Sequence, residues 1–330
     1  MPIDYQRELA VAVEAVREAA VLCQAVQALV SPDGMEKKDR SPVTVADFGS
    51  QALVCRAIRA AFPHDPIVAE EDSDELRRPE NAALAERVAG HVRRRRQAEL
   101  TEILEWIDFG GAADYSERFW TLDPIDGTKG FLRGEQYAVA LALIVAGQVQ
   151  VAALACPNLP AASSGSEKSP SAGCVATAIR GRGAELSPLS GGGAAPIRVS
   201  GIRESTSARM CESVESGHSK HDAAAEVSRR LNITAPPERL DSQAKYAVVA
   251  RGSAEIYLRL PTRADYREKI WDHAAGVLVV EEAGGRATDV AGRPLEFTHG
   301  SELTNNRGIV ATNGLLHDAV LETLAALGMS

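Results

Sequence analysis

Residues 120–130, Trp-Thr-Leu-Asp-Pro-Ile-Asp-Gly-Thr-Lys-Gly, constrain the fold of this chain more than any other part of the sequence. They predict an apolar strand that ends in two carboxylates and a tight turn, because the proline fixes φ and the first glycine tolerates unusual backbone angles. Such a turn can direct Asp123, Asp126 and the Ile125 carbonyl at one point, and hard oxygen ligands of this kind suit Mg²⁺. Asp, Pro and Gly also dominate purely structural turns, so the segment alone leaves both interpretations open.

Composition and charge exclude several classes of protein. The net charge of −9, from 45 acidic and 36 basic residues, argues against a general nucleic-acid-binding surface. The apolar stretch 137–149 is too short to span a bilayer, and an N-terminal region with Glu8, Glu14 and Glu18 suits no targeting peptide. Five scattered cysteines without a Cys-x-x-Cys pair indicate reduced thiols. We therefore expect a cytoplasmic protein that binds neither nucleic acid nor a membrane.

The pattern of apolar residues mixes helices with strands. Helical spacing predicts helices at 9–23, 223–231 and 273–283, a polar helical stretch at 74–105, and a helix that Thr44 or Asp47 caps. Short apolar runs predict strands at 66–69, 174–179, 247–249 and 255–260, and a hairpin formed by 137–145 and 149–155. This mixture predicts layered sheets and helices rather than an all-α or all-β fold.

Three further carboxylates stand at the ends of predicted elements: Asp47, Glu70 and Asp272. Metal-assisted hydrolysis of a phosphate ester needs several carboxylates from different elements, because more than one Mg²⁺ must be held near one phosphate. Each residue alone has an ordinary explanation, since Asp47 and Asp272 suit helix starts and Glu70 could be a surface acid. Their combination with the Asp-Pro-Ile-Asp turn predicts a site for several metal ions.

Four segments, in order along the chain, resemble the lithium-sensitive, inositol-monophosphatase-like phosphatases. They are Pro42-Val-Thr-Val-Ala-Asp47, Glu70-Glu71, Asp123-Pro-Ile-Asp-Gly-Thr128, and Trp271-Asp-His-Ala-Ala-Gly276 followed by Glu282-Ala-Gly-Gly285. The resemblance implies an α/β fold, the five-layered α/β/α/β/α sandwich of the inositol monophosphatase and fructose-1,6-bisphosphatase type. It also implies an N-terminal metal-binding lobe over residues 1–157 and a C-terminal substrate-binding lobe over 158–330, which supplies Asp272 as well.

The same resemblance assigns roles in the site. Two or three Mg²⁺ ions are expected to be held by Glu70, Asp123, Asp126, Asp272 and the Ile125 carbonyl. Asp47 and Thr128 would orient and deprotonate the water that attacks phosphorus, so that no covalent phosphoenzyme is required.

Within this superfamily, the continuation Lys129-Gly-Phe-Leu-Arg133 resembles the 3′(2′),5′-bisphosphate nucleotidases. Residues 217–222, 240–246 and 255–261 are similar to the substrate lobe of that family. The resemblance implies substrate contacts from Gly127, Thr128, His218, Ser219, Ser242, Lys245 and Arg259. A cation pair such as Lys245 and Arg259 suits a second phosphate, although surface charges remain the alternative.

The function implied is Mg²⁺-dependent hydrolysis of the 3′-phosphate of 3′-phosphoadenosine 5′-phosphate, which gives AMP and phosphate. The family also implies 3′-phosphoadenylyl sulfate as a possible second substrate, inhibition by lithium, a part in sulfur metabolism, and a monomer or weak homo-oligomer. One alternative is an inositol polyphosphate 1-phosphatase or inositol monophosphatase. Another is a silent protein that only binds the nucleotide, but such proteins usually lack metal ligands that are all present here.

Overall fold

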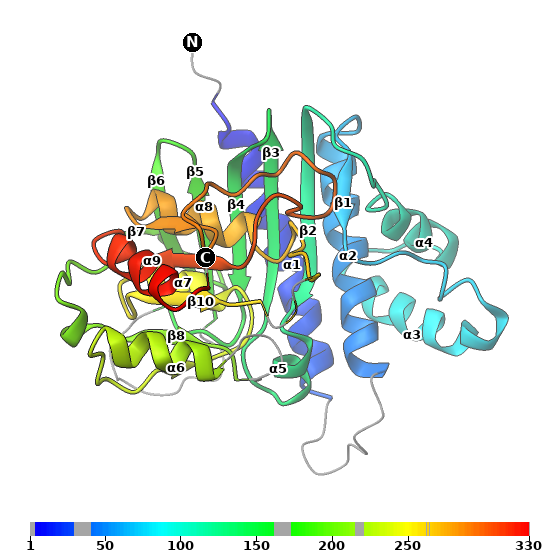
Figure 1. The fold of residues 1–330 in the computed structure, drawn as a ribbon. Coiled ribbons are helices and arrows are strands. Elements are labelled where there is room, and N and C mark those ends of the chain that lie inside the picture. Colours follow the sequence, from blue (N-terminus) through cyan, green and yellow to red (C-terminus); the bar gives the residue numbers. More distant parts are fainter. Residues whose placement is uncertain are drawn as a thin grey trace.

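The computed structural model describes residues 4–29, 41–161, 173–214, 221–261, 263 and 265–329 (Figure 1). The helices are α1 (Gln6–Gln27), α2 (Ser41–Ala61), α3 (Ala82–Arg93), α4 (Leu100–Asp108), α5 (Thr128–Leu132), α6 (His221–Arg230), α7 (Ala244–Ala250), α8 (Ala274–Glu282) and α9 (His317–Ala326). Single 3-10 turns are η1 (Pro79–Asn81) and η2 (Ser205–Ser207).

The strands form two sheets within the described residues. The seven-stranded sheet has the order β1 (Ile67–Ala69), β2 (Arg118–Asp126), β3 (Ala138–Val145), β4 (Gln148–Cys156), β5 (Cys174–Ile179), β6 (Gly183–Pro188) and β7 (Ala195–Ile197). The five-stranded sheet has the order β11 (Arg286–Thr288), β12 (Ile309–Thr312), β10 (Ile256–Arg259), β8 (Met210–Glu212) and β9 (Glu238–Arg239).

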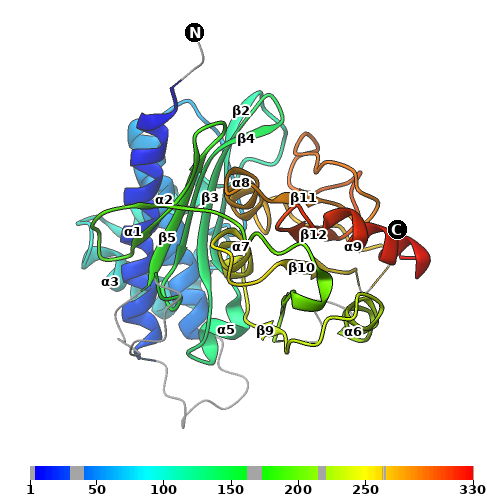
Figure 2. The ribbon, with the colours of Figure 1, turned by 90° about the vertical axis from the view of Figure 1, so that its left-hand side faces the viewer.

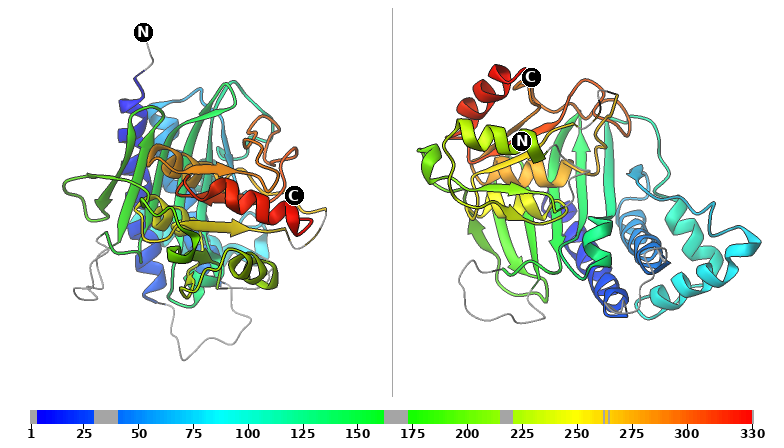
Figure 3. Two further views of the ribbon diagram at one scale, coloured as in Figure 1. Left: turned by 60° about the vertical axis from the view of Figure 1, so that its left-hand side comes forward. Right: turned by 60° about the horizontal axis from the view of Figure 1, so that its bottom comes forward.

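Helices and sheets stack in five layers, which Figure 2 shows nearly edge-on. The pair α1 and α2 covers one face of the large sheet, and α7 and α8 lie between the two sheets. The outer face of the small sheet carries α6 and α9, and both views of Figure 3 agree with this order. Among the described residues, three apolar clusters fill the spaces between the layers: one lies beneath α1 and α2, one surrounds α7 and α8 between the two sheets, and one lies beneath α6 and α9. The predicted α/β/α/β/α sandwich is confirmed.

The central strand β3 shows why the large sheet can be covered on both faces. Val139, Leu141 and Leu143 pack into the core under α1 and α2. The alternate residues, Ala138, Ala140 and Ala142, face the core beneath α7 and α8. Both sets are buried, so the strand is apolar throughout instead of alternating with polar residues. Small side chains on the second face leave room for the middle helices.

The large sheet extends beyond the boundary that was expected between residues 157 and 158. Its strands β5, β6 and β7 all follow that point in the chain and pair in sequence with β4. The division of the chain into two lobes stays a prediction, but any such division has to keep these strands with the first sheet.

Most predicted elements are confirmed, and two details are wrong. Residues 247–249 lie in α7 and not in a strand, because a run that is buried on all sides carries no periodicity to separate helix from strand. Helix α2 begins at Ser41, so Thr44 and Asp47 lie inside it and do not cap it; the proline at position 42 is tolerated in a first turn. Within the described ranges, every helix is too short or too polar to cross a lipid bilayer.

Two helical glycines give a matched test of this packing. A β-carbon at Gly276 in α8 would collide with the ring of Tyr246 in α7, a fully buried side chain. We expect Gly276→Ala to lower the free energy of unfolding by about 1–3 kcal/mol, the usual cost of overpacking. Gly90→Ala in α3 meets no atom within 4 Å and should stabilise the protein by up to about 1 kcal/mol. Guanidinium denaturation measures both, and equal stabilities would contradict the packing described here.

Candidate active site

A cavity of about 350 Å³ lies where the ends of β1 and β2 face the second half of the chain. Strands β1 and β2 are parallel and Ala69 pairs with Leu122, so Glu70, directly after β1, and Asp123, still within β2, lie side by side. The predicted site residues that line the cavity are Glu70, Asp123, Ile125, Asp126, Gly127, Thr128, Ser242, Lys245, Arg259 and Asp272. Asp47 is not part of this lining, and His218 and Ser219 lie outside the described residues.

A bulge and a left-handed glycine shape the Asp-Pro-Ile-Asp turn. Asp123 pairs with Ala140 and Asp126 with Ala138, so the register of β2 shifts between the two carboxylates. Gly127 has a φ of +92°, and a β-carbon there would lie 3.0 Å from Cβ of Ser242. The Ser50 hydroxyl of α2 supports the turn from behind by donating to the Pro124 carbonyl at 2.8 Å. The predicted tight turn is confirmed.

The carboxylates meet closely enough to share cations. Asp123, Asp126 and Asp272 each offer an oxygen, and these atoms lie within 4.8 Å of one another. Asp123 is only 2 % exposed, and its Oδ1 has no hydrogen-bond partner among the residues that the structure describes. A buried, unpartnered carboxylate oxygen beside two other acids is unfavourable unless a cation binds. The all-oxygen donor set therefore fits Mg²⁺.

Burial and mutual repulsion raise the pKa values of these acids. The pKa of Glu70 rises to about 8, through desolvation first and the charges of Asp272, Glu71 and Asp126 next. That of Asp126 rises to about 6, because desolvation and Asp272 outweigh the opposite effect of Lys245 and Arg259. Asp123 shifts in the same direction for the same reasons. The protein without metal therefore retains protons that a bound cation would displace.

Asp47 lies in α2 and does not line the cavity. It is buried, and desolvation followed by the charges of Glu71 and Glu70 raises its pKa well above the ordinary value. Thr128, in contrast, begins α5 and is exposed at the cavity. Of the two residues expected to act on the attacking water, Thr128 therefore lines the cavity and Asp47 is buried outside its lining.

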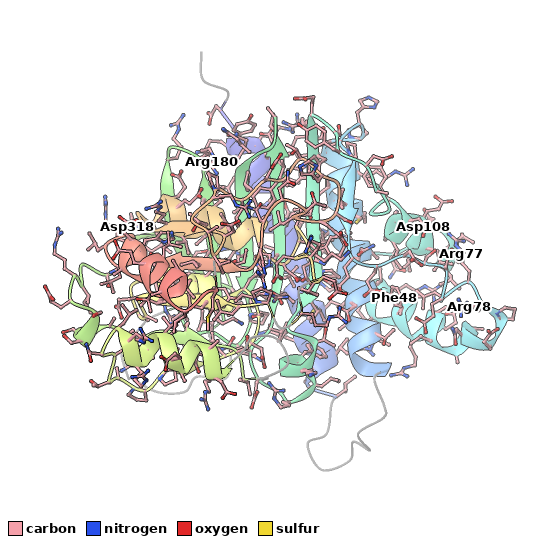
Figure 4. The ribbon with its side chains drawn as sticks, in the orientation of Figure 1. Phe48, Arg77, Arg78, Asp108, Arg180 and Asp318 are labelled. Carbon is pink, nitrogen blue, oxygen red and sulfur yellow. The ribbon has the colours of Figure 1, made fainter. Side chains whose placement is uncertain are left out.

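Two anchors hold the segment that carries Glu70, and neither was predicted. The buried Gln51 amide accepts a hydrogen bond from Glu71 N at 3.1 Å and donates to the Ile107 carbonyl at 3.0 Å. Asp108, at the end of α4, accepts from Ser73 N at 3.1 Å and pairs with Arg77, its neighbour in Figure 4. Gln51 lies only four residues beyond the matched segment that ends at Asp47, but its side chain shows its role only once the helix is in place.

The two predicted cations also line the cavity, and both have partners inside the protein. Lys245 in α7 is 3 % exposed, and its Nζ donates to the Leu240 carbonyl at 3.2 Å. Desolvation lowers its pKa. Arg259, at the end of β10, places Nε 2.6 Å from Glu268 Oε2 and Nη2 3.3 Å from Asp272 Oδ2. The alternative that these residues are surface charges is therefore wrong.

Comparison with known proteins gives consistent results over the whole chain. A model of the inositol monophosphatase family matches residues 4–328. The chain is 43% identical to the 3′(2′),5′-bisphosphate nucleotidase of Emericella nidulans, with 98% of each protein covered. It is 44% identical to the protein of that name from Oryza sativa, with 97% of this chain and 94% of that protein covered.

Solved structures share the fold at lower identity. An inositol monophosphatase from Anabaena aligns with a TM-score of 0.64 and 23% identity, over 98% of this chain and 97% of that one. An IMPase from Thermotoga maritima aligns with a TM-score of 0.65 and 20% identity, over 98% of both chains. These likenesses support the layered architecture.

The raised pKa values predict how stability depends on pH without metal. Between pH 6.5 and 8 the folded protein holds more protons than the unfolded chain, because the pKa of Glu70 is about 8 in place of 4.5. The free energy of unfolding should therefore fall as pH rises through this window, by about 1 kcal/mol after allowance for the exposure of Glu70 to solvent. Burial lowers the pKa of His317 from 6.5 to about 4, so below that window, between these two values, this residue makes the free energy of unfolding rise with pH.

Urea denaturation at three pH values, with and without Mg²⁺, measures this dependence. Mg²⁺ should stabilise the protein most at pH 8, where the ion competes with the fewest protons. A stability that rises with pH in the metal-free protein across the same window would contradict the crowding of carboxylates.

Proposed function

The chain belongs to the inositol monophosphatase family, and from this premise we propose that it is a Mg²⁺-dependent 3′(2′),5′-bisphosphate nucleotidase. It hydrolyses the 3′-phosphate of 3′-phosphoadenosine 5′-phosphate and releases AMP and phosphate. One observation carries the proposal: a single cavity is lined both by clustered carboxylates and by two cations, Lys245 and Arg259. Carboxylates with metal suit the phosphate that is cleaved, and the cations suit a second phosphate that is only bound. The names of the relatives in Emericella and Oryza support this substrate class.

We assign the metal-binding role to the carboxylates of Glu70, Asp123, Asp126 and Asp272 together with the Ile125 carbonyl. The unpartnered Asp123 Oδ1 supports this assignment. When bound, two or three Mg²⁺ ions would lower the pKa of water and offset the charge of the phosphate. The acids would then be ionised, and the positive charge of the cations would offset the repulsion that raises their pKa values.

Thr128 and Asp47 are assigned to the attacking water. Thr128 lines the cavity, and a threonine hydroxyl can accept a hydrogen bond from water while it donates one of its own. Asp47 has a raised pKa, which makes its carboxylate a better acceptor for the proton that the water loses. This route transfers phosphate directly to water.

Lys245 and Arg259 are assigned to the 5′-phosphate, and Gly127 and Ser242, which also line the cavity, to further substrate contacts. His218 and Ser219 are assigned to the adenosine. The proposal includes 3′-phosphoadenylyl sulfate as a second substrate, since it carries the same 3′-phosphate. It also includes inhibition by lithium, a cytoplasmic part in sulfur metabolism, and a monomer or weak homo-oligomer.

A substrate panel tests the proposed function. Phosphate release with Mg²⁺ should give a kcat/KM for 3′-phosphoadenosine 5′-phosphate at least about tenfold above those for inositol 1,4-bisphosphate and inositol 1-phosphate. Asp126→Asn, which removes a charge at nearly constant volume, should fold and yet release no phosphate, and so controls for contaminating phosphatase. Preference for inositol 1-phosphate would refute the nucleotide assignment. Tight nucleotide binding without turnover at any Mg²⁺ concentration would indicate a binding protein instead.

Replacing Lys245 with methionine tests the site for the second phosphate. Methionine has nearly the length of the buried side chain and removes its charge and its hydrogen bond to the Leu240 carbonyl, whereas loss of Arg259 would remove the cation paired with the buried Glu268 carboxylate. We expect Lys245→Met to lower kcat/KM for 3′-phosphoadenosine 5′-phosphate by about 10- to 100-fold, the value of a charge-assisted hydrogen bond. The matched substrate 3′-AMP, which lacks the 5′-phosphate, should lose much less. Equal losses on both substrates would contradict the assignment.

A further inference from the structure

Gln243 joins the two parts of the chain that supply carboxylates to the cavity. It is 1 % exposed and stands directly before α7. Its backbone N–H donates to Asp126 Oδ2 at 2.6 Å. The preceding residue, Ser242, has a φ of +70°, a left-handed conformation that costs free energy for any residue except glycine. Such strain persists only where surrounding contacts impose it, and here those contacts include the close approach of Gly127 to Ser242.

The side chain of Gln243 binds the other carboxylate-bearing segment. Its Nε2 donates to the Trp271 carbonyl at 2.8 Å, and its Oε1 accepts from Gly276 N at 3.0 Å. Trp271 directly precedes Asp272, and Gly276 lies in the first turn of α8. One end of the amide thus meets an acceptor and the other a donor, which defines its orientation. The backbone on both sides of Asp272 is therefore tied to one side chain.

These contacts act against a repulsion. The Asp126 and Asp272 carboxylates come from different layers of the fold and offer oxygens within 4.8 Å of each other. Like charges at this separation repel, and the repulsion grows as both groups ionise to bind a cation. Gln243 bonds to the Asp126 carboxylate through its backbone and to the Asp272 segment through its side chain. It therefore links the two carboxylate-bearing segments and resists their separation.

We propose that Gln243 is a positioning residue, which sets the distance between the Asp126 and Asp272 carboxylates and thereby the affinity of the site for divalent metal. This inference rests on the proposed function only in that both carboxylates are taken as metal ligands. Outer contacts that orient ligand groups typically change metal affinity by about 10- to 100-fold when they are lost.

Metal binding without substrate tests the inference directly. Gln243→Met keeps the length of the side chain and the backbone bond to Asp126, but removes both bonds to the Asp272 segment. Gln243→Ala is a second variant, because Gln243 lines the cavity and water can then reach the freed backbone groups. Mn²⁺, which takes the same oxygen ligands as Mg²⁺, serves as the probe, and electron paramagnetic resonance measures its binding to the full-length metal-free protein.

Asn313 provides a matched control. Its amide is also 1 % exposed and also binds backbone, donating to the Ile202 carbonyl at 2.8 Å and accepting from Leu316 N at 3.2 Å. It does not line the cavity within the described residues. Asn313→Leu should therefore lower thermal stability in the same way as Gln243→Met and leave the Kd for Mn²⁺ unchanged.

The expected result is a Kd for Mn²⁺ raised about 10- to 100-fold in both Gln243 variants and not in Asn313→Leu. If the wild-type protein binds Mn²⁺ and the Gln243 variants bind it equally well, the inference is overturned while the proposed function stands. If the variants lose affinity but the wild type prefers inositol phosphates, the substrate proposal fails and the inference holds. A wild-type protein that binds no Mn²⁺ overturns both.

Discussion

The repulsion among the carboxylates at the ends of β1 and β2 is the constraint that the rest of the site depends on. Ionised groups this close repel one another, and this repulsion together with burial raises the pKa values of Glu70 and Asp126, so that protonation is favoured when no metal is bound. Contacts with the backbone of the segments that carry these groups can hold them together and leave the carboxylate oxygens available to a cation. Gln51 and Ser50 of α2 act in this way from one side of the sheet. On the other side, the Gln243 side chain does the same for the Asp272 segment.

The layered architecture explains how supports from such distant segments reach one point. The large sheet is covered by α1 and α2 on one face and by α7 and α8 on the other, so the edge where β1 and β2 end lies between two helix layers. Alanines on one face of β3 let the middle helices approach closely. Gly276 lets α8 pack against the Tyr246 ring of α7. Small residues thus bring the Asp272 segment near the Asp126 turn, and polar contacts then complete the placement.

The sequence predicts the local chemistry of the site and the order of its segments along the chain. The Asp-Pro-Ile-Asp turn, the strand before Glu70 and the helix after Asp272 follow from turn residues and apolar runs, so their convergence on a cavity was predictable. The helix at 247–249 was not, since a fully buried run of small and branched residues has no polar face to give its period. Gln51 and Gln243 were also missed. A glutamine that binds backbone from another segment leaves no local signal, and only the tertiary packing identifies its partners.

The cations and the carboxylates that line the cavity affect each other's charge. Lys245 and Arg259 lower the pKa of Asp126 against the larger effects of burial and of Asp272, so the cations ease ionisation of a proposed metal ligand before any ligand arrives. Arg259 goes further and pairs directly with Asp272. A phosphate bound to Lys245 and Arg259 would attract the Arg259 guanidinium. A metal ion bound to the carboxylates would then replace Arg259 as the partner of Asp272. Binding of the phosphate and binding of the metal should therefore favour each other. The phosphate takes the Arg259 charge away from Asp272, and the metal supplies Asp272 with a new positive partner. A substrate with two phosphates can bind the metal ions with one phosphate and the two cations with the other, whereas a monophosphate can make only one of these interactions.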